Sequence, residues 1–155
     1  MAKPVSKLIH NASEFIDALE NPESTDHSLI RFGTASIETW LEIVRHSEDA
    51  AVWVALNKTI PVEVIEVLAN HASARVRRFA ADKNRITPEL IVLLSTDSDP
   101  SVRLRIANHK KTGAEILRQL LRDDWVEVVA TARKRLDAFQ TALADLEPNA
   151  RTSLD

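Results

Sequence analysis

The groups that could do chemistry in this chain are basic side chains in its second half. Residues 74–135 hold 14 Lys or Arg against 8 Asp or Glu, whereas residues 1–73 hold 5 against 11. The formal net charge of −3 therefore conceals an acidic first half and a basic second half. A row of cations is suited to binding phosphates or an acidic peptide. The candidate partner-binding residues are Arg77, Arg78, Arg103, Arg105, Lys110, Lys111 and Trp125.

Two of these arginines also have a structural interpretation. Arg77 and Arg103 stand 26 residues apart, in the same phase of a repeat, and Arg103 follows the acid Asp97 by six residues. This pattern is typical of ion pairs between helical repeats, which fix geometry more than they recruit a ligand. We expect that structural role to dominate. Arg78 and Arg105, which have no matching partner in phase, are the better candidates for binding.

The three tryptophans could stack on nucleic-acid bases if they lay exposed beside the basic groups. Trp40 and Trp53 share repeat columns with Val64 and Phe79, so both are predicted to lie in the core. Trp125 belongs to no apolar column and is expected to be half exposed at the start of a helix. Trp125 is therefore the one tryptophan that we expect to contact a partner.

Composition excludes several kinds of active site. Without cysteine the chain has no thiol nucleophile, disulfide, thiolate zinc site or iron–sulfur ligand. Gly33 and Gly113 are its only glycines, so no glycine-rich loop is present to hold a nucleotide phosphate. It also has no His-x-x-x-His, His-Glu-x-x-His or Gly-x-Ser-x-Gly motif. We predict no metal, no cofactor and no catalytic residue, and only an arrangement created by folding would supply one.

The elements that must position these residues follow a repeat of 26 residues. Within each unit the apolar residues are spaced by three and four, which indicates helices. A helical repeat of this length predicts stacked short helices that bury a continuous core. The clearest apolar columns are Ala50, Val76, Val102 and Val128, then Val54, Ala80, Ile106 and Ala132, then Leu68, Leu94 and Leu120.

Four helix starts carry capping signals. In two of them an N-cap residue precedes proline at the first helical position, and two others have the spacing of a capping box. The pairs are Thr87–Pro88, Asp99–Pro100, Thr112–Glu115 and Asp124–Glu127. The paired acids at 97, 99, 123 and 124 are therefore interpreted as N-caps rather than as catalytic carboxylates.

The predicted fold class is all-α, because no segment alternates with period two. One domain is expected over residues 1–147, with repeats near 36–60, 61–86, 87–112 and 113–133, a capping helix at 125–146 and a frayed polar tail at 148–155. Helices are predicted at residues 13–20, 28–33, 36–46, 49–57, 61–70, 75–83, 88–96, 100–109, 113–122 and 125–146.

Three stretches resemble a known family: Val76–Asn84, Thr87–Leu90 and Ser98–Arg103 are similar to the leucine-rich repeat variant, a helical relative of the HEAT repeat. The resemblance covers roughly residues 36–133, and the short period departs from HEAT units of about 40 residues. It implies a right-handed superhelix, or α-solenoid, of stacked short helices and little about activity, since such folds are scaffolds. One described type carries an iron–sulfur cluster on cysteines, which this chain lacks.

The leading prediction is a non-catalytic helical-repeat scaffold that binds another protein through its surface. The alternative is a nucleic-acid-binding module that uses Arg78, Arg103, Arg105, Lys110 and Lys111. HEAT-like solenoids also include DNA glycosylases, but no tryptophan here has the aspartate four residues on that such a site would suggest, and a glycosylase-like or hydrolytic enzyme is disfavoured. The longest apolar run, residues 50–56, is far shorter than the ~20 residues that a membrane span needs, and a cytoplasmic protein is expected.

Overall fold

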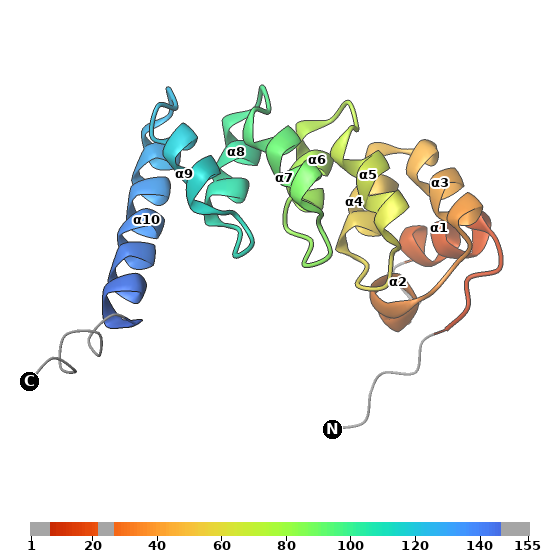
Figure 1. Cartoon of the computed structure of the whole chain (residues 1–155). Helices are drawn as coiled ribbons and strands as arrows, with labels where there is room; N and C mark the ends of the chain where they lie inside the picture. The colour runs from red at the N-terminus through yellow and green to blue at the C-terminus, as the bar shows by residue number, and fades with distance from the viewer. Residues whose placement is uncertain (1–6, 22–26, 147–155) are drawn as a thin grey trace, which may run out of the picture. The chain divides into compact units, whose positions relative to one another are not determined.

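The computed structural model describes residues 7–21 and 27–146, and at 27 and 143–146 it describes the backbone alone. Within these ranges the chain forms ten helices and no strand, apart from an isolated bridge between Leu8 and Thr34. Figure 1 shows the helices joined by short loops. They are α1 Ala12–Glu20, α2 His27–Phe32, α3 Ile37–His46, α4 Glu48–Leu56, α5 Val62–Ala69, α6 Ala74–Ala80, α7 Pro88–Ser95, α8 Pro100–Asn108, α9 Ala114–Leu120 and α10 Val126–Leu146.

The all-α prediction is confirmed, and each predicted helix has a counterpart whose ends differ by at most three residues. The expected polar tail at 148–155 lies outside the described residues. The chain divides into two compact units, residues 1–90 (unit 1) and residues 91–155 (unit 2), with the division inside α7. The single domain over 1–147 stays a prediction.

Two of the four predicted N-caps form. Asp99 accepts the backbone N–H of Ser101 at 2.8 Å, with Pro100 in the first turn of α8. Thr87 accepts the N–H of Leu90 through its hydroxyl at 3.4 Å, directly before Pro88. Both caps bond a backbone donor that the helix itself leaves without a partner.

The predicted cap at Thr112 is wrong. Gly113 occupies the N-cap of α9, and no side chain bonds the first turn there. Thr112 is buried, and its hydroxyl donates to the carbonyl of Ile106 at 2.6 Å. A buried hydroxyl must find a partner, and the nearby carbonyl satisfies it better than a helix end that water can reach.

The predicted cap at Asp124 is also wrong, because α10 begins at Val126 and Asp124 is exposed. The neighbouring acid takes the local role instead. Asp123 accepts the backbone N–H of Trp125 at 2.8 Å, two residues on. Asp97 accepts the N–H of Asp99 in the same way at 2.9 Å, so both acids shape the loop before a helix.

In unit 1 the helices pack in two rows. Helix α3 contacts α1 and α5, helix α4 contacts α2 and α6, and the pairs α3–α4 and α5–α6 join the rows. The repeat columns lie between the rows, where their side chains are buried. These side chains include Ala50, Val54, Val64, Leu68, Val76 and Ala80.

Gly33 is required by space rather than by backbone conformation, because no described residue has a positive φ. A Cβ atom at this position would lie 2.3 Å from the carbonyl oxygen of Leu29 and 2.7 Å from Cδ1 of Ile9. The segment before α1 lies against this turn, and Ile9 N–H donates to the carbonyl of Thr34 at 2.7 Å. Any side chain at Gly33 would push this segment away.

In unit 2, helices α8, α9 and α10 contact one another and enclose a small core. The repeat columns again supply its buried side chains, among them Val102, Ile106, Leu117, Leu120, Val128 and Ala132. The long α10 contributes two of these residues from its first half.

The prediction that Trp53 lies in the core is wrong, whereas that for Trp40 is confirmed. Trp40 is 1% exposed and meets the ring of Phe15 edge to face at a centroid distance of 5.6 Å. Trp53 is 40% exposed. Helix α4 already buries Ala50, Val54 and the residues next to them, so the indole takes the remaining outer face of the helix.

Candidate functional site

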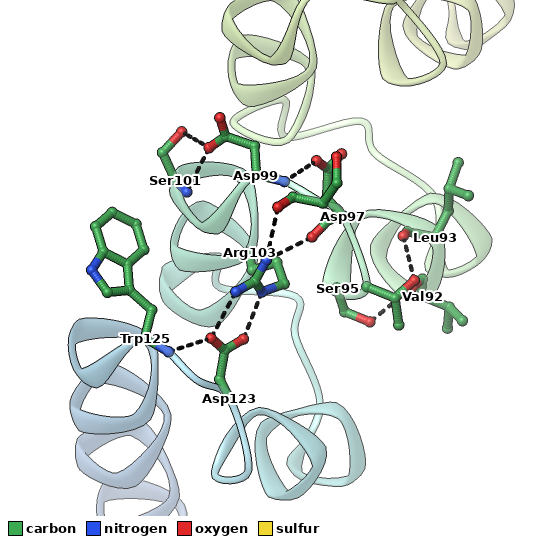
Figure 2. A network of polar contacts seen from close by, with 11 residues as sticks. Val92, Leu93, Ser95, Asp97, Asp99, Ser101, Arg103, Asp123 and Trp125 are labelled. Atoms are coloured by element: carbon green, nitrogen blue, oxygen red, sulfur yellow. Dashed lines mark hydrogen bonds and ion pairs between the residues drawn. The ribbon is translucent and has the colours of Figure 1, made fainter.

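A cluster of polar side chains in unit 2 surrounds Arg103. Its Nε donates to Oδ2 of Asp123 at 2.6 Å, and its Nη2 donates to Oδ1 of the same carboxylate at 2.8 Å. Nη1 donates to the carbonyls of Asp97 and Ser98 at 2.7 and 3.3 Å. Figure 2 shows this network, in which the Trp125 side chain points away from the ion pair. Arg103 thus joins α8 to the loop before it and to the loop before α10.

The electrostatics of the pair follow from this geometry. The hydrogen bonds from Arg103 lower the pKa of the Asp123 carboxyl below its usual value, and the Trp125 N–H adds to that shift while burial opposes it. The pKa of Arg103 is raised for the same reason. A guanidinium held by a carboxylate and two carbonyls has its donors directed inward. Arg103 is therefore poorly placed to contact a phosphate.

Arg77, which precedes Arg103 by 26 residues and lies in unit 1, makes the same kind of backbone contacts. Its Nη1 donates to the carbonyls of His71 and Ala72, each at 2.8 Å. These acceptors precede Arg77 by six and five residues, as Asp97 and Ser98 precede Arg103. Each arginine ties down the loop before its own helix, as a structural role requires. The predicted acidic partner of Arg103 is wrong, because Asp123 supplies the carboxylate and Asp97 accepts through its backbone carbonyl.

The other candidate residues are spread over both units. In unit 1, Arg78 lies with its Cζ 5.3 Å from the centroid of the Phe79 ring, and its buried Nε has no hydrogen-bond partner among the residues described. In unit 2, Arg105 and Trp125 are half-buried, and Lys110 and Lys111 are exposed in the loop after α8. Their role in binding stays a prediction.

A second polar pattern was not recognised in the sequence. Lys83 donates through Nζ to the carbonyl of Asn57, 26 residues earlier in unit 1. Arg135 donates through Nη1 to the carbonyl of His109, also 26 residues earlier, at 3.0 Å in unit 2. The four residues share one phase of the repeat, and this in-phase set of polar residues is the signal that could have revealed the pattern.

The side chain of Asn57 holds in place the loop whose carbonyl accepts from Lys83. Its amide is fully buried, and Nδ2 donates to the carbonyls of Ile30 and Gly33 at 2.8 and 3.1 Å. Its Oδ1 accepts the N–H of Thr59 at 2.7 Å. A buried amide with its donors and acceptor in use fixes the position of the loop on both sides of it.

Lys83 also lines a cavity of about 450 Å³ in unit 1, formed by α4, α5, α6 and the loops that follow α4 and α6. Burial lowers the pKa of the Lys83 ammonium from 10.5 to about 8. The charge of Asp82 opposes this shift, and the charge of Lys58 adds to it. Lys83 has therefore lost much of its hydration, and the charge of Asp82 compensates only part of that loss.

Comparison of the chain with protein-family models, with curated proteins and with solved structures finds no match. The site must therefore be interpreted from its own geometry.

A groove is also present on the α3–α5 side of unit 1. It lies between α3 and the end of α5, has a volume of about 550 Å³ and is lined by Val44, Arg45, Glu66, Val67 and His71 among others. Val67 is 41% exposed although it is a large aliphatic residue.

No group of three or more His, Asp or Glu residues in the described part of the chain is placed to hold a metal ion. None of the helices described has both the length and the apolar composition needed to cross a bilayer.

Proposed function

We propose that this chain is a non-catalytic α-solenoid domain of the leucine-rich repeat variant type, and that it binds another protein on the surface of its α1–α3–α5 row. The repeat assignment is supported by the two rows of helices in unit 1. It is also supported by side-chain contacts that join residues 26 apart, such as Lys83 with Asn57 and Arg75 with Asp49. These polar contacts hold repeats together and leave the outer surface for a partner.

The observation that carries the binding proposal is the groove between α3 and α5. Its lining combines aliphatic side chains, including the exposed Val67, with the cation Arg45 and the anion Glu66. Apolar side chains together with charges of both signs are typical of a protein contact surface. A nucleic acid would favour cations alone, because its backbone is uniformly negative.

Nucleic-acid binding is the less favoured alternative. Of the residues that it would use, Arg103 is held by Asp123 and by two carbonyls. Loss of a central cation weakens a phosphate-binding row, because affinity follows the number of phosphates neutralised.

Site-specific photocrosslinking tests the proposal. A photoreactive amino acid in place of Val67 is expected to capture a defined protein partner in cells, whereas the same amino acid in place of the exposed Arg122 in unit 2 captures none. Val67→Glu should abolish binding of that purified partner while leaving the thermal unfolding midpoint within about 2 °C of the wild-type value. Equal capture at both positions, or a Val67→Glu variant that binds its captured protein normally, contradicts the proposal.

A further inference from the structure

The cavity of unit 1 brings cationic side chains together beside apolar ones. Lys58, Lys83 and Arg85 line it, and Ile60, Ile65 and Phe79 form apolar parts of its wall. Asp82 is the one acidic residue among its lining residues. A volume of about 450 Å³ falls in the range of small-molecule sites, which combine apolar walls with a few polar groups.

The two lysines of this cavity repel each other. The charge of Lys58 is close enough to lower the pKa of Lys83. The Lys83 ammonium has one hydrogen-bond acceptor among the described residues, the carbonyl of Asn57. Lys58 Nζ lies 5.5 Å from the centroid of the Phe32 ring. Neither lysine forms a salt bridge with a described carboxylate, although the charge of Asp82 favours the Lys83 ammonium. The three cations of the lining, Lys58, Lys83 and Arg85, outnumber this one acid.

The geometry points to a binding site for a small organic carboxylate in this cavity, with its carboxylate between Lys58 and Lys83 and its apolar body against Ile60, Ile65 and Phe79. An anion there would remove the repulsion between the ammonium groups and would supply acceptors for the remaining N–H donors of Lys83. The apolar wall requires a ligand with a hydrocarbon or aromatic body, because a fully hydrated anion would leave that wall wet.

This site is independent of the proposed protein-binding groove. The cavity is formed by α4, α5, α6 and the loops at residues 57–60 and 82–85, whereas the groove involves α3 and the end of α5. No residue lines both the cavity and the groove. Either proposal can therefore fail without the other.

Carboxylate binding should be coupled to protonation. The Lys83 pKa of about 8 is low because burial disfavours the ammonium. A bound carboxylate favours the ammonium again, so the pKa of Lys83 should rise when the ligand binds and the protein should take up protons near pH 8. A ligand held by apolar contacts alone would not produce this uptake.

The test uses the full chain and three probes: benzoate, its neutral analogue benzamide, and inorganic phosphate. Methyl resonances of Ile60 and Ile65 and the titration of Lys83 are followed by NMR. Benzoate is expected to shift the methyl signals with a dissociation constant of about 1 mM or lower and to raise the Lys83 pKa by about one unit. Benzamide and phosphate are expected to bind at least about tenfold more weakly.

Variants locate the site. Lys58→Met and Lys83→Met should each weaken benzoate binding about tenfold, whereas Lys134→Met in unit 2 should leave it unchanged. Lys58 is exposed, so Lys58→Met gives a result even if Lys83→Met fails to fold. The proposal is overturned if benzamide binds as tightly as benzoate, if phosphate alone does so, if the Lys83 pKa does not move, or if benzoate at about 50 mM shifts no signal of the cavity.

Discussion

Arg103 and Asp123 form a two-bond ion pair within unit 2, with Nε–Oδ2 and Nη2–Oδ1 distances of 2.6 and 2.8 Å. The side chains are only 17% and 5% exposed. Parallel hydrogen bonds between a guanidinium and a carboxylate are stronger than a single contact, and their loss leaves a poorly solvated charge. The pair therefore links α8 to the loop before α10, and Arg103 also holds the loop before α8. Apolar packing alone would not fix the positions of these loops.

Removing the arginine should destabilise the fold. Arg103→Met leaves the Asp123 carboxylate without its guanidinium partner and should lower the free energy of unfolding by roughly 2–3 kcal/mol. Urea unfolding measures the change. Arg122→Met, which removes an exposed arginine from the same unit, should change stability by less than about 0.5 kcal/mol. A loss at Arg103 no larger than at Arg122 would show that the ion pair contributes nothing.

The same pair should make stability depend on pH in the acid range. The folded-state pKa of Asp123 is lowered by the hydrogen bonds from Arg103. Its stabilising contribution is therefore present in full above the ordinary pKa of an aspartate, about 4, and is lost as pH falls through the lower folded-state value. Asp123→Asn should lower stability near pH 6, and the difference from wild type should shrink as pH falls below about 4. Asp124→Asn, at an exposed position, should follow the wild-type curve.

Lys83 should make stability rise with pH in the alkaline range. Its pKa falls from 10.5 in the unfolded chain to about 8 in the folded protein. Between these values the unfolded chain binds more protons, so the free energy of unfolding should rise with pH, by about 1–2 kcal/mol after allowance for the part of the side chain that water still reaches. Lys83→Met should abolish this rise in urea unfolding near pH 7.5 and pH 10. If the rise persists in Lys83→Met but is lost in Lys134→Met, the assignment to Lys83 is wrong.

The two glycines should respond in opposite directions to one substitution. A side chain at Gly33 meets the Leu29 carbonyl, so Gly33→Ser should lose about 1–3 kcal/mol. Gly113 has open space around its missing Cβ and extended backbone angles at the N-cap of α9. A serine there can cap the helix, so Gly113→Ser should gain about 0.5–1 kcal/mol. Thermal unfolding of both variants gives the signs, and two changes of the same sign would refute the argument.

The tryptophans provide a test of the core. Trp40→Leu should lose about 2–4 kcal/mol because it leaves a void beside Phe15, whereas Trp53→Leu should lose less than about 1 kcal/mol. Acrylamide quenching distinguishes the two residues. The fraction of tryptophan fluorescence that acrylamide can quench should fall in Trp53→Leu and should not fall in Trp40→Leu. Equal losses of stability would place both indoles in the core.

Much of the helical pattern could be predicted because the columns specify which side of each helix is buried. The columns do not show how much of the protein interior the neighbouring side chains of each helix already occupy. Trp53 shares the phase of Phe79 but lies on the outer face of α4, because the small and branched side chains around it take the interior. Thr112 failed as a cap for a similar reason, since a buried carbonyl competes for its hydroxyl.

The polar contacts were harder to predict because many of their acceptors belong to the main chain. A backbone carbonyl has the same chemistry at every residue, so polar residues spaced by 26 mark a shared phase without showing which atom accepts from Lys83. Arg103 with Asp123 is a contact between side chains, but its partner lies twenty residues ahead rather than six behind. The cavity at Lys83 depends on three helices and two loops, which no local pattern describes.

The use of carbonyl acceptors has a consequence for how such a chain can change over time. Lys83 binds the carbonyl of Asn57, and Arg135 binds that of His109, so any residue type at either position offers the same acceptor atom. The acceptor's side chain can then acquire a separate task, as the Asn57 amide has done toward Ile30 and Gly33. Segments joined through carbonyl acceptors can therefore differ in side chains at the acceptor position and still bond to the segment 26 residues earlier.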